Sequence, residues 1–484
     1  MPRFRSQARR KETKLTKLRA LLLGLSLTML LSAGCAVGPN YKRPSTDVPG
    51  MYRGATPQEA AQPAASQSFG DQKWWEVFQD KQLQDLIHTA LQQNYDVRIA
   101  ATRILEAQAQ LGITRADQLP TISGGALAVN ERNPKTKLFR QYETSANQLD
   151  LSLAWELDFW GKYRRATEAA RANLLATEWA HEAVVSTLVS DVATAYFQLR
   201  SLDLQLEISR RTLALRQDSL QLTQTLANGG ATSMLDVRQA EQLVDTAAET
   251  IPDLERRIEQ QENLMSILLG KNPAPVTRGK PLVENLLLPV VPAGLPSSLL
   301  ERRPDIQSSE QLLVAANARI GVAKAAYFPQ ITLTAVGGYQ SSALTDLFSG
   351  PAGLWSFGGQ LAQPIFTGGK IRSNVRLTEA QQHEAVLLYQ QSIQQAFREV
   401  SDSLVAYRKN QEFRSQQELL TNSGQDATRL ANMRYQGGVT SYLEVLDSDT
   451  RYFDAQIGLA QAQLNERLAM VQLYNALGGG WQQP

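Results

Sequence analysis

The side chains that most often perform catalysis or bind metals are few and widely separated in this sequence. The three histidines, His88, His181 and His383, lie far apart without the spacing of a metal site. The sequence also lacks a glycine-rich phosphate loop and a Gly-x-Ser-x-Gly nucleophile motif. We therefore expect no enzymatic activity and no cofactor.

Cys35 is the one residue with a predictable chemical modification. It is the only cysteine, so no disulfide can form within the chain. It follows a basic head and a short apolar run in residues 1–34, and these predict an export signal peptide because the run is shorter than the ~20 residues of a spanning helix. A cysteine at this position is typical of bacterial lipoproteins, in which the sulfur takes a diacylglycerol and the freed amine a third acyl chain. We expect lipidation of Cys35 and an extended segment over residues 35–74; ordinary signal cleavage nearby is the alternative.

The charge of the exported chain is weakly acidic. The full sequence has 49 basic and 47 acidic residues, and residues 1–34 hold 8 of the basic and 1 of the acidic ones. This leaves 41 basic against 46 acidic residues, a net charge of −5. The basic pI therefore belongs to the signal peptide, and no nucleic-acid binding is expected.

The rest of the chain is an internal duplication. Residues 229–237 and 437–445 share the pattern Gly-Gly-x-Thr-Ser-x-Leu-acid-Val at an offset of 208. Upstream, "NYDVRIAATRILEAQAQLGITRADQLPTI" aligns without a gap on "RPDIQSSEQLLVAANARIGVAKAAYFPQI" at an offset of 209. We expect two copies of one unit, 75–272 and 285–480, joined by a proline-rich linker over 273–284 and followed by a tail over 481–484.

Each copy contains a stretch that predicts a very long helix. The 67 residues between Gly161 and Gly229 contain no glycine or proline, and the stretch between Gly369 and Gly437 contains no proline and one glycine. A helix of that length reaches ~100 Å and requires coiled-coil packing. The turns are then the tips of two helical hairpins, in which glycine relieves the strain of ending a helix and a threonine or the following serine caps the return helix. The tip residues are Gly229, Gly230, Thr232, Gly437, Gly438 and Thr440.

Two strands are expected in each copy before the long helix. The segment "DLSLAWELDF" alternates apolar and polar residues, and "WSFGGQLAQPIF" keeps the same parity more weakly. The strands before them start after Pro120 and Pro329. Strands of ~10 residues with one apolar face are typical of outer-membrane barrels. Four strands cannot close a barrel, so several chains must share one; a water-soluble sandwich is the alternative.

These features together resemble one family. A lipoprotein-like cysteine followed by "VGPNYKRP", the segment "LLERRPDIQSSEQLLVAANARIGVAKAAYFPQI", two Gly-Gly tips and the closing "LYNALGGGW" are similar to the outer-membrane factors of tripartite efflux systems, the TolC and OprM type. The lipoprotein branch that serves drug pumps is the nearest resemblance. It implies an α+β membrane protein that forms a homotrimer, with a 12-stranded barrel in the outer membrane and a 12-helix tunnel in the periplasm.

The resemblance also implies partners and a gate. The partners are a periplasmic adaptor (membrane fusion) protein, which meets the tips, and an inner-membrane proton-driven pump of the resistance-nodulation-division class. Leu443 corresponds to the apolar ring that narrows the closed tunnel, Asp447 to a carboxylate ring beside it and Tyr435 to a residue that holds the inner helices shut. The first copy has Leu235 and Gln239 at the positions of Leu443 and Asp447. An ordinary solvated aspartate is the alternative for Asp447.

The sequence leaves the partners of two further residues unassigned, and it leaves three alternative functions to consider. Arg434 and Arg238 are candidates for polar contacts at the tips, with partners that the sequence does not identify. The chain is expected to export drugs or other small organic molecules, because 7 methionines and 3 histidines give no metal relay. Metal efflux and type I protein secretion are alternatives with the same channel. A lipid-anchored periplasmic coiled-coil adaptor is the alternative without one.

Overall fold

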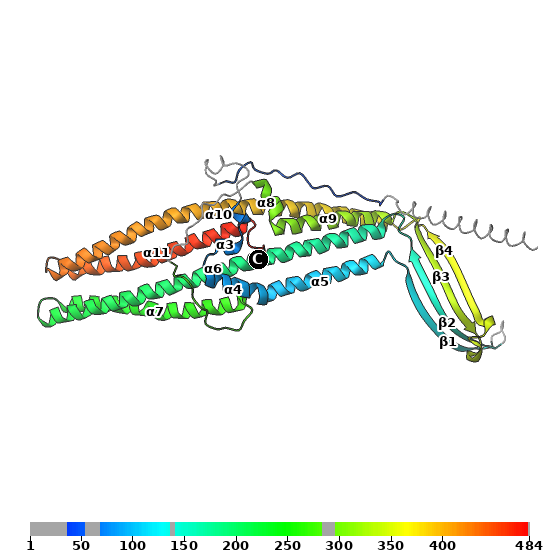
Figure 1. Cartoon of the computed structure of the whole chain (residues 1–484), viewed down its shortest axis with the longest axis horizontal. Coiled ribbons are helices and arrows are strands. Elements are labelled where there is room, and N and C mark those ends of the chain that lie inside the picture. Colours follow the sequence, from blue (N-terminus) through cyan, green and yellow to red (C-terminus); the bar gives the residue numbers. More distant parts are fainter. Residues whose placement is uncertain (1–35, 54–67, 136–140, 283–295, 483–484) are drawn as a thin grey trace, which may run out of the picture. The chain divides into compact units, whose positions relative to one another are not determined.

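The computed structural model describes residues 36–53, 68–135, 141–282 and 296–482. Outside the described residues lie the predicted signal peptide with Cys35, residues 54–67 and the end of the proline-rich linker. Before the first strand come η1 (Phe69–Asp71), α3 (Trp74–Val77), α4 (Lys81–Gln93) and α5 (Tyr95–Ala116). Figure 1 labels the α-helices and the strands.

Two helical hairpins dominate the chain, as the sequence predicts. The first consists of α6 (Lys162–Asn228, 67 residues) and α7 (Met234–Leu268, 35 residues). The second consists of α10 (Lys370–Gln436, 67 residues) and α11 (Tyr442–Ala476, 35 residues). Buried residues at the expected three-to-four spacing, such as Leu188, Val192 and Leu199, form the packed face of α6.

The two hairpins repeat with an unchanged offset, but they differ at one position. Every helix bound of the second hairpin lies 208 residues after its counterpart in the first. Pro252 lies inside α7, where α11 has Ala460. A proline in a helix interior removes one backbone hydrogen bond. The return helix of the first hairpin therefore continues through Pro252 with one hydrogen bond fewer than that of the second.

The four strands form one antiparallel sheet in the order β1-β2-β3-β4. They are β1 (Thr121–Asn133), β2 (Tyr142–Glu156), β3 (Gln330–Ser341) and β4 (Gly353–Ala362). β1 and β3 start directly after the prolines, as expected. β1 and β2 are longer than the expected ten residues because polar residues such as Glu131 and Thr144 extend their pairing beyond the apolar pattern.

The apolar faces of the strands coincide across the sheet. Leu153 lies opposite Ile122 on one side and Ala335 on the other. On the next strand, Ala335 lies opposite Phe357. The predicted parity of β2 and β4 is therefore confirmed, and the sheet carries one continuous apolar face.

The segment that follows Cys35 is held by side-chain contacts. The Val37 amide donates to the Trp160 carbonyl at 3.0 Å. The Arg43 guanidinium and the Tyr41 hydroxyl both bind the Glu310 carboxylate, at 2.5 and 3.0 Å, although Glu310 is only 8% exposed. A charge buried to this degree needs such partners. The segment "VGPNYKRP" is therefore held on α9 (Pro304–Ala325), and the Arg165 guanidinium, which donates to the Asn40 side chain at 2.7 Å, holds it on the start of α6.

The chain divides into two compact units that do not follow the two copies. The first contains residues 36–45, 104–176 and 309–389, and thus the whole sheet. The second contains residues from 46–103, 177–308 and 390–482, and thus both hairpin tips. Two short elements, η2 (Leu344–Asp346) and η3 (Gly350–Ala352), precede β4, and α8 (Pro296–Arg302) precedes α9.

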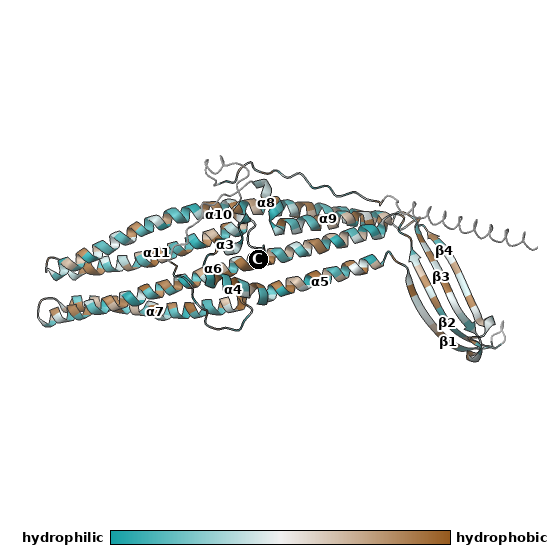
Figure 2. Cartoon of the chain, in the orientation of Figure 1, coloured by the Kyte–Doolittle hydropathy of each residue, from teal (hydrophilic) through white to brown (hydrophobic). Residues whose placement is uncertain are grey.

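Figure 2 shows apolar and polar residues interspersed along the long helices. Within the described residues, no helix has a stretch both long and apolar enough to span a membrane.

Candidate functional site

Glycine makes both hairpin tips possible. Gly230 and Gly438 have φ values of 73° and 68°, a left-handed conformation that other residues adopt at a cost. The Ala231 amide donates to the Leu226 carbonyl at 2.8 Å, and the Val439 amide donates to the Arg434 carbonyl at 3.0 Å. Both turns therefore end their long helix with the same hydrogen-bonded motif.

The return helices begin at the predicted serines rather than at the threonines. Ser233 is the N-cap of α7, and its hydroxyl accepts from the Asp236 amide. Ser441 occupies the N-cap of α11 without a side-chain bond. Thr232 instead donates to the Asp236 carboxylate, while no side-chain hydrogen bond involves Thr440 within the described residues.

Tyr435 connects the two tips. Its hydroxyl lies 3.2 Å from the Thr232 hydroxyl across the hairpins. Its ring packs edge-on against Tyr442 with centroids 5.1 Å apart, beside a cluster that includes Ala240 and Val445. Burial raises the pKa of the Tyr442 phenol. The structure thus brings Tyr435 and Thr232 together, and it does so within one chain.

Leu443 and Leu235 are exposed at the first turn of their helices. Their side chains are 57% and 65% exposed. Neither lies in the packed seam of its own hairpin, so both are available to contacts outside this chain.

The charged residues near the second tip are paired on its surface. The Arg451 guanidinium binds the Asp447 carboxylate at 2.9 Å, one helical turn away. Arg434 binds Glu444 at 3.4 Å, whereas Arg238 on the first hairpin binds Glu241 at 2.6 Å. Such exposed pairs contribute little to stability, ~0–1 kcal/mol each, and leave the side chains free to exchange partners.

Sequence reasoning missed the most buried ion pair between the hairpins. The Arg216 guanidinium on α6 binds the Asp449 carboxylate on α11 at 2.7 Å, and the Arg216 side chain is 3% exposed. Arg216 also donates to the Leu243 carbonyl of α7 at 2.9 Å and stacks over the Phe453 ring at 5.0 Å. The Arg216 side chain therefore holds three helices together, and its partner Asp449 lies two residues after Asp447.

A comparison of the two copies contains a signal for this pair. At the offset of 208, Arg216 aligns with Gly424, the one glycine inside α10. A long charged side chain in one copy and none in the other indicates a contact made by only one hairpin.

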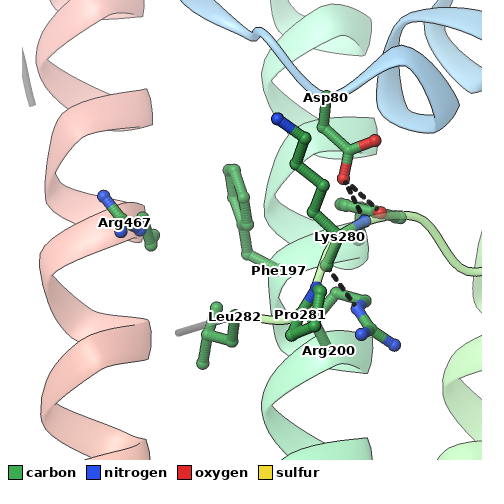
Figure 3. Close-up of a pocket in the computed structure, with 8 residues that line it drawn as sticks. Asp80, Phe197, Arg200, Lys280, Pro281, Leu282 and Arg467 are labelled. Atoms are coloured by element: carbon green, nitrogen blue, oxygen red, sulfur yellow. Dashed lines mark hydrogen bonds between the residues drawn. The ribbon is translucent and has the colours of Figure 1, made fainter. Parts of the chain in front are cut away.

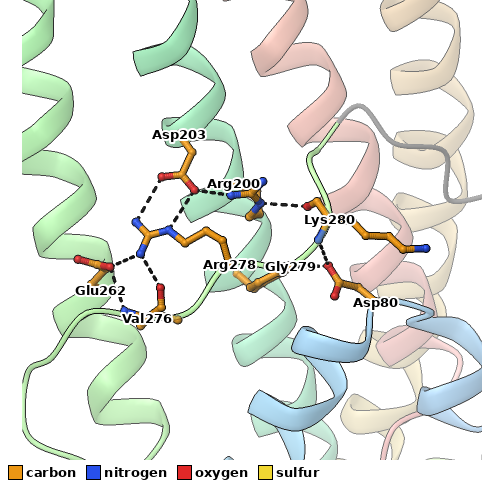
Figure 4. Close-up of polar contacts among 9 residues, drawn as sticks. Asp80, Arg200, Asp203, Glu262, Val276, Arg278, Gly279 and Lys280 are labelled. Atoms are coloured by element: carbon orange, nitrogen blue, oxygen red, sulfur yellow. Dashed lines mark hydrogen bonds and ion pairs between the residues drawn. The ribbon is translucent and has the colours of Figure 1, made fainter.

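A second polar network fixes the start of the proline-rich linker (Figure 4). The Tyr196 hydroxyl donates to the Asp80 carboxylate at 2.6 Å and accepts from the Gly279 amide at 3.0 Å. Arg278 pairs with Asp203 at 3.2 Å and with Glu262. Three helices, α4, α6 and α7, are thereby linked through residues 276–280.

The cavity beside this network is too small for a transported molecule (Figure 3). It measures about 10 Å³ and is lined by Asp80, Arg200 and Lys280 among others. That is at most the space of one water molecule. Over the described ranges, no cluster of three or more histidine, cysteine or acidic residues is arranged to hold a metal ion.

The sequence matches a family model described as "Outer membrane efflux protein" over residues 86–271 and 295–479. The solvent efflux pump outer membrane protein SrpC of Pseudomonas putida is 39% identical over 472 residues, which cover 94% of this chain and 97% of the relative. The antibiotic efflux pump outer membrane protein ArpC of Pseudomonas putida is 37% identical, covering 95% and 96%. The cation efflux system protein CusC of Escherichia coli is 36% identical, covering 96% and 99%.

Solved structures agree with the sequence relatives. A crystal structure of CusC superposes with a TM-score of 0.85 at 33% identity, covering 92% of this chain and all of that one. The open state of the MtrE outer membrane channel of Neisseria gonorrhoeae superposes with a TM-score of 0.83 at 30% identity, covering 93% and 99%. The expected fold class is thereby confirmed. This chain belongs to the outer membrane efflux protein family and is the outer-membrane channel of an efflux pump, not an enzyme.

Proposed function

We propose that this channel is the exit duct for drugs, solvents and other small organic molecules. The observation that supports this substrate class is the agreement among relatives, since those named for solvent, toluene and antibiotic efflux are 37–39% identical over 94–95% of the chain. The exposed tip residues carry no chemistry that selects one molecule, so selection falls to the pump.

Cation export is the second candidate, because CusC is similar over 96% of the chain. A strain that lacks this chain separates the two. We expect it to become sensitive to toluene and to hydrophobic antibiotics and to regain resistance when the chain is returned. Sensitivity to transition-metal cations alone would instead favour the second candidate.

The assembly that we propose is a homotrimer with a shared barrel. β1 and β4 each pair with one neighbouring strand, and their outer edges have no partner among the described residues. Such unpaired edges cannot face lipid. Three chains supply twelve strands and a tunnel of twelve long helices. The channel then joins a periplasmic adaptor at the tips and, through it, a proton-driven inner-membrane pump of the resistance-nodulation-division class.

The gate belongs to the second hairpin in this proposal. The exposure of Leu443 and the position of Asp447 one turn beyond it are compatible with rings around a common axis. Tyr435 and Thr232 would hold the hairpins together in the closed state. The tip glycines and Thr440 remain the proposed adaptor contact.

The anchor and the repeats complete the proposal. Lipid on Cys35 would attach the chain to the outer membrane next to the seat of residues 36–43. Two copies, over 75–272 and 285–480, are supported by the two separate matches to the family model. The first 34 residues would be removed as the signal peptide.

A further inference from the structure

The outer edges of β1 and β4 determine how copies of this chain join. In a trimer, β4 of one copy must pair with β1 of the next, because these are the two edges of the sheet. Many registers satisfy that requirement. The internal duplication selects one of them.

The strand pairs β1–β2 and β3–β4 have the same register when residue numbers are shifted by the repeat offsets. Thr121 on β1 lies opposite Ala154 on β2. Shifting Thr121 by 209 residues gives Gln330, and shifting Ala154 by 208 gives Ala362. Gln330 and Ala362 are indeed opposite each other in β3–β4. The same offsets therefore transfer a strand register from one copy to the other.

The join between β2 and β3 is the template for the join between chains. It is the place within one chain where the first copy meets the second, and Ser152 lies opposite Val336 there. Resting on the proposed trimer, we propose that β4 pairs with β1 of the next copy so that Gln360 lies opposite Leu127. The neighbouring positions follow: Gly359 lies opposite Ala128, and Leu361 opposite Ala126.

The position of the apolar face supports this register without use of the repeat offsets. Leu361 lies opposite Ile331 on the apolar face of β3. Ala126 lies opposite Leu149 on the apolar face of β2. The proposed register puts Leu361 and Ala126 side by side and continues that face around the ring. A shift by one residue would reverse the face at every seam, whereas a shift by two would preserve it.

Charge at the helical end of the two edges is complementary. In the first copy, Lys162 and Arg164 bind the acids Glu156 and Asp158, at 3.0 and 3.4 Å. In the second copy these acids are replaced by Pro364 and Phe366.

Lys370 and Arg372 remain, exposed and without an ion pair to any described residue. The opposite edge supplies the missing acid. Asp117, just before β1, stands where the second copy has Ala326. It too is exposed, and it makes no ion pair with a described residue. We therefore assign Asp117 of the next copy as the acid that faces Lys370 and Arg372.

Disulfide trapping measures the register in the full-length protein. The test pairs are Gln360→Cys with Leu127→Cys and Gly359→Cys with Ala128→Cys. Adjacent antiparallel pairs have Cα separations of ~5.5 and ~4.5 Å, both within the disulfide range. The shifted pairs, Gln360→Cys with Val129→Cys or Gly125→Cys, keep the same face. Their yield should be roughly tenfold lower because diagonal neighbours are ~7–8 Å apart.

The matched control lies inside one chain. Ser152→Cys with Val336→Cys is the internal image of the first test pair, and it should close within the monomer. The test pairs should instead give covalent dimers and trimers on a non-reducing gel. Gln360→Cys alone should give neither.

Two results would overturn the register. One is preferential cross-linking of a shifted pair. The other is an intact trimer in which the internal control closes and both test pairs stay reduced. An unsubstituted protein that is monomeric in mild detergent would instead refute the trimer itself. For the charge contact, Lys370→Glu with Arg372→Glu should lower the trimer fraction, and adding Asp117→Lys should restore it.

Discussion

At the scale of single residues, the two copies differ in charge at the positions of the proposed gate. Leu443 and Leu235 are equivalent in sequence and similarly exposed, whereas Asp447 aligns with Gln239. Asp447 also has Arg451 beside it, and the first copy has Leu243 at the position of Arg451. Charge near the proposed axis therefore comes from the second hairpin.

Substitutions at these positions should change conduction. If Leu443 lines the proposed apolar constriction, Leu443→Ala would widen and wet it, so single-channel conductance should rise severalfold. Asp447→Ala removes an acid and leaves Arg451 unpaired, so cation selectivity should fall. Planar-bilayer recordings of the purified protein measure both. Leu235→Ala and Gln239→Ala are the matched controls, and equal effects in the two hairpins would place the gate elsewhere.

Arg216 should matter for stability more than any exposed pair. Arg216→Ala leaves the Asp449 carboxylate without its partner, and breaking a buried pair costs about 3–5 kcal/mol. Arg210→Ala breaks the Arg210–Glu255 pair, whose side chains are 59% and 46% exposed, and should cost at most ~1 kcal/mol. Denaturant unfolding followed by circular dichroism compares them. Similar losses would show that Arg216 does not hold the hairpins.

At the scale of elements, periodicity predicted most of the fold. The long helices and their tips follow from the absence of helix breakers and from paired glycines, and the strands follow from alternation after proline. The comparison of the two copies marks Arg216, but the partners of Arg216 and Tyr196 could not be predicted. Asp449 and Asp80 each lie more than 100 positions from them. Local patterns do not encode which distant faces meet.

The sheet should tolerate charge on only one face. Leu149 lies midway along β2 between Ala126 and Tyr339. If that face meets lipid, Leu149→Arg should cost ~2–4 kcal/mol at the bilayer midplane. Gln148→Arg, on the opposite face, is the control and should cost much less. Urea unfolding in lipid vesicles measures the difference, and equal costs would contradict a lipid-facing apolar side.

At the scale of the whole molecule, the proposed lipid on Cys35 and the strands would attach the chain to the membrane separately. The seat of Tyr41 and Arg43 on Glu310 fixes the segment directly after Cys35. The mature N-terminus should carry acyl chains, which intact mass spectrometry detects. Cys35→Ala behind a cleavable signal should still fold, because the strands supply their own contact with the membrane. A mature Cys35 without added mass would refute lipidation.

The proline within α7 should make the return helix of the first hairpin open locally more often than that of the second. Pro252 has no amide hydrogen, so the Ala248 carbonyl lacks the partner that every carbonyl in the corresponding turn of α11 retains. Local opening of a helix is easiest where a backbone hydrogen bond is missing. Amide protons around residue 250 should therefore exchange with deuterium faster than those around residue 458, and Pro252→Ala should slow them. The second hairpin, which carries the proposed gate, would thus be the more rigid of the two. The first hairpin would open locally near the middle of α7.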